Sequence, residues 1–314
     1  MRKKSKTREE LVKMYIDSLE EGKIPWEKMW STSIPENAIS GEEYKGVNNL
    51  ILSYVAQKRG YKDNRWCTFY QLSKKGWKLS SKAKGQSVNI EFWKAYCISE
   101  KKLYNFSEYY NIIEKEPERK NDFVPFVNNF QVFNADLIEG ISPQEKVKKT
   151  IITNEYIDSL IQNLNVKYKE EGNEAYYNIE EDEIVLPISS DFKNEYAYYS
   201  TQLHEIAHST GHPTRLNREM SSKFGTKEYA KEELRAEISS SFLMQKLNLE
   251  YDDKHYLNHK SYIQSWIEIL NDKPTELFNA ISDAKKITDY IDLNSKEKNI
   301  LNDIENDYDK EIEI

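Results

Sequence analysis

The sequence predicts an α+β protein with two domains, a small mixed α/β domain followed by a mostly helical one. The chain has 314 residues, which is enough for two domains of ordinary size. Residues 1–100 contain 19 of the 45 Lys and Arg but only 12 of the 53 Asp and Glu, which leaves 26 and 41 for the rest of the chain. A basic region therefore precedes an acidic one, and we expect the two domains to have different partners.

The first domain is expected to span residues 1–140 and to mix helices with strands. Apolar residues recur at helical spacing in its early segments, whereas later segments contain short apolar runs interrupted by glycines. The polar and charged stretch 106–123 indicates a surface insertion. The pattern predicts helices at Thr7–Glu20 and Asn48–Lys58 and strands at Val88–Ile98 and Phe126–Phe133, followed by a linker at 141–150.

The second domain is expected to span residues 151–291, and an acidic tail, 292–314, follows it. Long stretches with helical periodicity dominate this region, and Gly211, Pro213 and Pro274 mark helix boundaries. A strand or hairpin is expected at 175–188, because its part Asp182–Ile188 is apolar and rich in β-branched residues. The predicted helices are Thr153–Leu164, 194–211, Thr226–Leu247, His255–Leu270 and Thr275–Ile291.

The segment His204–His208 matches the pattern HExxH, in which two histidines stand four residues apart and a glutamate follows the first. On a helix, positions i and i+4 share a face, so both imidazoles can bind one metal ion and Glu205 can reach the attacking water. The apolar run Tyr196–Leu203 favours a helix here. The motif predicts a metal-dependent hydrolase with His204 and His208 as ligands and Glu205 as the catalytic base.

A third ligand is expected on the helix Thr226–Leu247, because catalytic zinc sites commonly use three protein ligands and keep one position open. Glu233 is the predicted ligand, and Glu232 is the main alternative. Glu237 lies one turn beyond Glu233 and is expected to accept a hydrogen bond from a ligand imidazole. The competing interpretation is that these acids form only a solvated helix face.

Other residues near the motif have less specific interpretations. The metzincin pattern requires a third histidine where this chain has Thr214, so His212 is not the predicted ligand. The apolar stretch Asp182–Ile188 is predicted to hold an extended peptide by backbone hydrogen bonds. Tyr256, His259 and Tyr262 are candidates for stabilising an oxyanion, with packing roles as the alternative.

Residues 58–94 combine cations with aromatic side chains and contain ten Lys or Arg against two acids. Cations follow a phosphate backbone and exposed rings stack on bases, so this composition favours single-stranded nucleic acid, whose bases are free to stack. The alternative is that the rings belong to the core and the lysines to a solvated face. The predicted contacts are Arg65, Trp66, Tyr70, Lys74, Lys75, Trp77, Lys78, Lys82 and Lys84.

The cysteine count and the hydropathy indicate in which cellular compartment the protein is expected. Two cysteines, Cys67 and Cys97, exclude a disulfide framework and favour a reducing environment. No apolar run approaches the roughly 18 residues that a membrane span needs. The basic start of the chain lacks the apolar stretch of a secretory signal. The sequence therefore predicts a cytoplasmic protein with no membrane partner.

The chain resembles the ArdC antirestriction proteins of conjugative plasmids and related mobile elements. In the first half the resemblance rests on IPWEKMW (24–30), EYKGVNNLIL (43–52) and NRWCTFYQL (64–72). In the second half it rests on the string HExxHxxGHPxRLxR at 204–218 and on EELRAE at 232–237. The resemblance covers most of the chain, and the second pair of motifs is specific.

This resemblance implies a first domain that binds single-stranded DNA and a second, zincin-like metallopeptidase domain that together protect an incoming plasmid from restriction enzymes. It implies metal ligation by His204, His208 and a glutamate of EELRAE, with Glu205 as catalytic acid and base. Zn²⁺ is the expected ion, with Mn²⁺ or Co²⁺ as alternatives. The expected partners are single-stranded DNA and, as a peptide substrate, a host restriction or regulator protein. Two alternatives remain: an intracellular metallopeptidase that cleaves a regulator, and a DNA-binding protein whose metal site only stabilises the fold.

Overall fold

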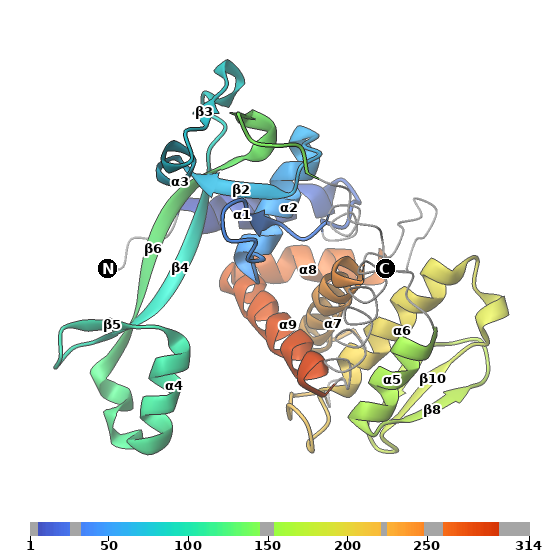
Figure 1. The fold of residues 1–314 in the computed structure, drawn as a ribbon. Coiled ribbons are helices and arrows are strands. Elements are labelled where there is room, and N and C mark those ends of the chain that lie inside the picture. Colours follow the sequence, from blue (N-terminus) through green and yellow to red (C-terminus); the bar gives the residue numbers. More distant parts are fainter. Residues whose placement is uncertain (1–5, 26–32, 145–153, 221–224, 248–259, 295–314) are drawn as a thin grey trace, which may run out of the picture. The chain divides into compact units, whose positions relative to one another are not determined.

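The computed structural model of the protein describes residues 6–25, 33–144, 154–220, 225–247 and 260–294 (Figure 1). The chain forms two compact units, one of residues 35–144 and one of residues 1–34 together with 145–314. This organisation is the two-domain α+β fold that the sequence predicts. The boundary between Gln144 and Glu145 falls inside the predicted linker 141–150.

The units differ from the predicted domain bounds at the start of the chain. Helix α1 (Lys6–Glu20) matches the predicted helix but packs against α8 (Lys260–Asp272), so residues 1–34 group with the later unit and not with the first domain. Leu11, Tyr15 and Leu19 recur four residues apart and are almost fully buried. Such a stripe needs an apolar partner surface, and the sequence alone did not show which domain supplies it.

The first unit is built on a five-stranded sheet with the order β1-β2-β6-β4-β5. Its two long strands, β4 (Val88–Cys97) and β6 (Phe123–Asn134), pair antiparallel from Val88 opposite Val132 to Cys97 opposite Phe123. The shorter strands are β1 (Glu36–Asn37), β2 (Arg65–Thr68) and β5 (Lys102–Tyr104).

Both predicted strands of this sheet are confirmed, but β6 begins at Phe123 and not at Phe126. Pro125 lies inside the extension, opposite Ala95 of β4. Strand β2 pairs with β6 only from Val132 onward, so Pro125 has a strand on one side only among the described residues. Prolines occur in such edge positions because one side of the strand has no ladder that needs their N–H.

Helices and a second small sheet surround the long strands. Helix α2 (Val47–Arg59) confirms the predicted helix and ends at Gly60, whose φ of 69° is the left-handed conformation common at helix ends. The predicted surface insertion 106–123 contains α4 and η3, neither of which has a buried residue. The other elements are α3 (Phe69–Lys74), β3 (Lys78–Leu79), which pairs with β7 (Ile138–Glu139), η2 (Ser81–Ala83), α4 (Phe106–Lys115), η3 (Pro117–Asp122) and η4 (Ala135–Leu137).

The second unit combines a small sheet with long helices. The sheet has the order β8-β10-β9, and its antiparallel pair β9–β10 confirms the predicted hairpin. The predicted helices of this unit are confirmed. Residues 255–259 of the predicted helix His255–Leu270 lie outside the described residues, and so does the predicted tail beyond Asn294. The elements are α5 (Asn154–Leu164), β8 (Lys167–Glu170), β9 (Tyr176–Asn178), β10 (Glu183–Leu186), η5 (Ser189–Asp191), α6 (Glu195–Ser209), α7 (Lys227–Lys246), α8 and α9 (Thr275–Asn294).

Helices α6 and α7 lie side by side at the centre of this unit and are mostly buried. Asn194 caps α6 by accepting from the Ala197 N–H, and Thr226 caps α7 by accepting from the Tyr229 N–H. Apolar residues of α5, β10, α6, α7 and α9 share one core. No helix in the described part of the chain is both long and apolar enough to span a membrane.

Candidate metal centre

Helix α6 places His204 and His208 one turn apart on the face that meets α7. Their ring centroids are 4.7 Å apart and their two Nε2 atoms are 3.0 Å apart. Both side chains are largely buried. Two imidazole nitrogens that converge at this distance are placed to share one ion.

Helix α7 supplies the third group, Glu233. Its carboxylate oxygens lie 3.5 Å from Nε2 of His204 and 3.4 Å from Nε2 of His208. The candidate ligand atoms of these three residues all lie within 4.8 Å of one another. Two nitrogens and one carboxylate in this arrangement fit a divalent cation with an open coordination position. The geometry favours Glu233, the predicted ligand, over Glu232.

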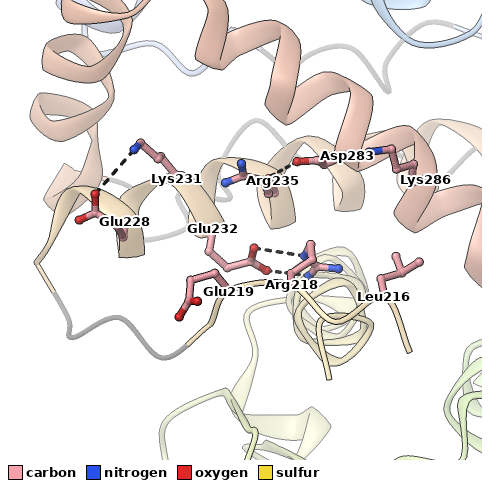
Figure 2. Close-up of a pocket in the computed structure, with 9 residues that line it drawn as sticks. All are labelled: Leu216, Arg218, Glu219, Glu228, Lys231, Glu232, Arg235, Asp283 and Lys286. Atoms are coloured by element: carbon pink, nitrogen blue, oxygen red, sulfur yellow. Dashed lines mark hydrogen bonds and ion pairs between the residues drawn. The ribbon is translucent and has the colours of Figure 1, made fainter. Parts of the chain in front are cut away.

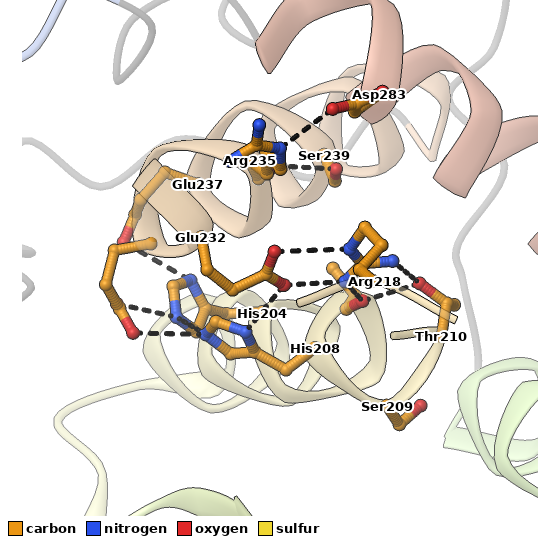
Figure 3. A network of polar contacts seen from close by, with 12 residues as sticks. His204, His208, Ser209, Thr210, Arg218, Glu232, Arg235, Glu237, Ser239 and Asp283 are labelled. Carbon is orange, nitrogen blue, oxygen red and sulfur yellow. Dashed lines mark hydrogen bonds and ion pairs between the residues drawn. The ribbon is translucent and has the colours of Figure 1, made fainter. Parts of the chain in front are cut away.

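Two further glutamates of α7, Glu232 and Glu237, approach the other ring nitrogens, Nδ1, of the imidazoles (Figure 3). Oε1 of Glu232 lies 3.3 Å from Nδ1 of His208. Oε1 of Glu237 lies 3.2 Å from Nδ1 of His204, within the distance of an ion pair with a charged imidazole. Carboxylates at Nδ1 select the tautomer that leaves Nε2 free for an ion. Glu237 was expected in this role from the sequence, whereas Glu232 was expected only as an alternative metal ligand.

Arg218 holds Glu232 in place. Its guanidinium contacts both carboxylate oxygens, at 2.6 and 3.2 Å, and also donates to Oγ1 of Thr210 and to the carbonyl of Ala207 (Figure 3). Arg218 therefore connects the end of α6 to α7. Its contact with Glu232, and that of Glu232 with His208, link the three side chains in series. The spacing of Arg218 after the motif is visible in the sequence, but its partner is not.

The charges of the cluster shift the pKa values of its members. Burial disfavours the charged imidazole of His208, but Glu233 and Glu232 outweigh burial and raise its pKa to about 9. At His204, Glu237 and Glu233 likewise outweigh burial and raise the pKa well above its ordinary value. Burial would raise the pKa of Glu233, but the two histidines lower it. The site thus stabilises positive charge, as a cation-binding site must.

Glu205 lies on the same helix between the histidines and is buried. Burial raises its pKa, and the positive charges of His204 and His208 offset only part of that rise. A carboxylate whose pKa is moved toward neutrality is suited to accept and release a proton.

Two tyrosines lie beside Glu233. Burial raises the pKa of Tyr229, and so do the charge of Glu233 and hydrogen bonds with Tyr262 and Glu233. Burial and the charge of Glu233 also raise the pKa of Tyr262, an oxyanion candidate from the sequence. Tyr229 was not predicted, although it stands four residues before Glu233 on α7. The other two candidates, Tyr256 and His259, lie outside the described residues.

The structure bears on two further expectations, for His212 and for Asp182–Ile188. His212 bonds to Oγ1 of Thr214 at 2.7 Å and is not part of the three-ligand cluster, as predicted. The prediction that Asp182–Ile188 holds an extended peptide is wrong for its strand, β10. Residues Glu183–Val185 already pair with β8 on one side and β9 on the other. A strand with both edges paired has no free backbone groups for a peptide.

A charged pocket of about 360 Å³ lies next to Glu232 (Figure 2). It is lined by four cations, Arg218, Lys231, Arg235 and Lys286, and by four acids, Glu219, Glu228, Glu232 and Asp283, together with Leu216. Arg218 pairs with Glu232, and Arg235 pairs with Asp283 at 2.8 Å. The formal charges of the lining therefore sum to zero.

The predicted DNA contacts divide into buried and exposed groups. Trp66 is 0% exposed, and Trp77 packs against the core cluster of Cys67, Leu72 and Ile138. Arg65 bonds to Asp63 and to the carbonyl of Ser142. Trp66 therefore cannot stack on a base in this structure, because its ring fills the core. Tyr70 is 66% exposed, with Nζ of Lys74 4.6 Å from its ring centroid, and Lys75, Lys78, Lys82 and Lys84 are also exposed.

Comparison with known proteins connects both units to one family. The N-terminal domain of anti-restriction factor ArdC matches residues 5–133, and a zincin-like metallopeptidase domain matches residues 155–283. The metal-free crystal structure of the antirestriction ArdC protein from the R388 plasmid is 26% identical, with a TM-score of 0.72 over 93% of this chain and 98% of that one. This chain is an ArdC-type protein. The Mn(II)-bound structure of the same R388 protein matches with a TM-score of 0.71.

Other relatives extend the comparison. Two Escherichia coli proteins named DNA primase TraC are each 33% identical to 90% and 93% of this ArdC-type chain, which spans only 27% and 20% of their lengths. Uncharacterized protein y4eC of Sinorhizobium fredii (strain NBRC 101917 / NGR234) is 29% identical over 90% of both chains. The zincin-like domain and the Mn(II)-bound relative support a divalent metal ion at the cluster of His204, His208 and Glu233.

Proposed function

We propose that this ArdC-type protein protects incoming DNA from host restriction in the cytoplasm by binding single-stranded DNA and by a metal-dependent peptidase site. The proposed DNA-binding domain is the unit of residues 35–144, and the proposed peptidase domain is residues 151–291 of the other unit. The peptidase proposal rests on one observation, the convergence of His204, His208 and Glu233 with carboxylates at both Nδ1 atoms. Zn²⁺ is the proposed ion, with Mn²⁺ or Co²⁺ as alternatives, because imidazole and carboxylate ligands suit all three.

A divalent ion at this site would polarise a peptide carbonyl and lower the pKa of water enough for attack at neutral pH. Glu205 then accepts a proton from the attacking water and passes it to the leaving amine as the C–N bond breaks. Its burial supports this role, because burial raises the pKa of the carboxyl.

The two tyrosines beside Glu233 complete the proposed site. Their hydroxyls can donate to the carbonyl oxygen of the substrate as negative charge develops on it. An ordinary tyrosine is protonated at neutral pH, as a donor must be, and burial raises the pKa values of Tyr229 and Tyr262 further. The proposed peptide substrate is a host restriction or regulator protein.

The decisive test is Glu205→Gln, which removes the base but preserves the size of the side chain. We expect the variant to keep its metal content by mass spectrometry and its melting temperature, and to lose protection of plasmid transfer into a restricting recipient. Glu228→Gln, at an exposed position of α7, is the matched control. Full protection by Glu205→Gln would instead favour a DNA-binding protein whose metal site only stabilises the fold.

A third candidate function is cleavage of a regulator without any role for DNA. Oligonucleotide binding distinguishes it from the proposed function. Fluorescence anisotropy across a salt series should show tight binding of single strands that weakens with salt. Weak binding with no salt dependence would contradict the DNA part of the proposal and leave a metallopeptidase with a protein substrate.

A further inference from the structure

One face of the β4–β6 pair carries three exposed phenylalanines. Phe92, Phe126 and Phe130 are 47%, 41% and 42% exposed. The register places Phe92 opposite Asn128, Lys94 opposite Phe126 and Ile90 opposite Phe130, and opposite residues share a face of a sheet. We call Phe92, Lys94, Phe126, Asn128 and Phe130 the aromatic face.

The same face of the sheet is buried where β4 begins and β6 ends. Its residues there are Val88, Ile90 and Val132, which are almost fully buried, as is Trp66 of the neighbouring β2. Burial therefore ends along one continuous face: exposed Phe130 lies opposite buried Ile90, and Phe92 and Phe126 lie further along the strands. Rings of Phe92 and Phe130 touch edge to face, with centroids 5.5 Å apart, and their outer surfaces remain open to solvent. Clustered exposed phenylalanines mark a binding surface more often than isolated ones do.

Exposed lysines gather where β4 begins and β6 ends. Lys74 lies on α3, Lys78 on β3 and Lys82 on η2, with Lys75 and Lys84 beside them, and β3 pairs with β7, which follows β6 closely. Exposed Glu139 lies opposite Lys78 across the β3–β7 pair, but the two acids of residues 58–94 do not face these lysines in solvent. Asp63 is paired with Arg65, and Glu91 is buried, with Nε1 of Trp93 donating to it.

The opposite end of the pair has the reverse charge. Residues 106–122, which form α4 and η3, contain five Asp or Glu against three Lys or Arg. Figure 1 shows α3 and β3 at one end of the β4–β6 pair and α4 at the other, so the lysines and the acids lie at opposite ends of one strand pair. The stretch Val88–Lys94 is about 20 Å long at the rise of an extended strand. That length suits a short stretch of nucleic acid with its bases on the rings and its phosphates on the lysines.

We propose that the aromatic face of β4 and β6 stacks the bases of single-stranded DNA, while the lysines of α3, β3 and η2 hold its phosphates. This inference rests on the proposed DNA-binding function and names the surface that performs it. Stacking needs bases that are not paired, so the surface discriminates against duplex. Phe92, Phe126 and Phe130 lie outside the contacts expected from the sequence, and they replace the buried Trp66 as the stacking rings.

The experiment uses the full chain with a fluorescein-labelled oligothymidine and a duplex of equal length. Phe92→Ala and Phe130→Ala should each weaken single-strand binding about 5- to 100-fold, the range found when a stacking ring is removed. Lys78→Ala and Lys82→Ala should each reduce the logarithmic salt slope by about 0.7. Tyr110→Ala is the matched control, because Tyr110 is a 59% exposed aromatic residue on the acidic α4. Circular dichroism checks that each variant is folded.

A second measurement locates the contact directly. Oligonucleotides with 5-iodouracil should crosslink under ultraviolet light to peptides that contain Phe92 or Phe130, as mass spectrometry would show. If the wild type binds single strands and the alanine variants bind equally well, the inference is overturned while the proposed function stands. If those variants instead abolish self-association seen by ultracentrifugation, the face is an interface between copies and the inference is overturned too. If the wild type does not bind, both fail.

Discussion

The metal cluster of the second unit and the aromatic face of the first place their functional side chains in opposite environments. His208, Glu232 and Glu233 are buried polar groups, each held by charged or hydrogen-bonded neighbours. Phe92, Phe126 and Phe130 are apolar groups left open to solvent. A buried polar cluster requires exact partners, because each unsatisfied group is costly. An exposed ring requires only a rigid strand beneath it, so we expect the two regions to respond differently to substitution.

The largest effect is expected from the ligand that α7 supplies. Glu233→Ala leaves His204 and His208 without the carboxylate that completes the cluster, so the protein should lose its metal during dialysis. Metal analysis and calorimetric titration with Zn²⁺ and Mn²⁺ would measure this loss. Glu228→Ala serves as the control on the same helix. Retention of a full equivalent of metal by Glu233→Ala would place the third ligand elsewhere.

A buried ring of the first unit should behave as part of the core and not as a DNA contact. Trp66→Ala removes a fully buried side chain and should lower the free energy of unfolding by about 3–5 kcal/mol. Phe92→Ala, at an exposed ring, should change it by less than about 1 kcal/mol. Chemical denaturation of both variants makes the comparison. Equal stability of the two would contradict the division between core rings and stacking rings.

The glutamates at the Nδ1 atoms should tune metal affinity without abolishing it. Glu237→Gln and Glu232→Gln preserve side-chain shape but weaken the acceptor opposite each imidazole, and we expect affinity to fall about 10- to 100-fold. Competition with a fluorescent chelator would measure it. Glu232→Gln should also cost stability because it removes the charge that pairs with buried Arg218. Unchanged affinity in both variants would show that these carboxylates do not orient the ligands.

The smallest expected effect is the pH dependence of stability that arises from the ion pair of Asp182 and Arg215 in the second unit. Burial of Asp182 opposes its ionisation, but hydrogen bonds from Arg215 and Tyr177 outweigh burial and lower its pKa. A lowered pKa contributes stability above the unfolded value of about 3.9, and that contribution is lost as pH falls through the folded value. Asp182→Asn should therefore cost about 1–3 kcal/mol at pH 7 and progressively less below about pH 4. A cost that does not change with pH would exclude this linkage.

The sequence alone identified the elements whose signals are local. The HExxH spacing, the caps at Asn194 and Thr226 and the long periodic runs are set within a few turns, so the helices α6 and α7 and the residues His204, Glu205 and His208 could be predicted. Glu233 could be expected because Glu233 and Glu237 are one turn apart on a helix that follows the motif. The alternation of short apolar runs was enough to place β4 and most of β6.

Only the tertiary structure decided which side chains meet across elements. The Arg218–Glu232–His208 chain joins residues of a loop and two helices, and no periodicity reports such a contact. The same limit applies to the rings of residues 58–94, because Trp66 and Phe92 are equally aromatic in sequence. Their roles separate only when the register of β2, β6 and β4 buries one and leaves the other in solvent. Helices, caps and spaced motifs depend on residues that are close in sequence, whereas burial depends on which distant segments pack together.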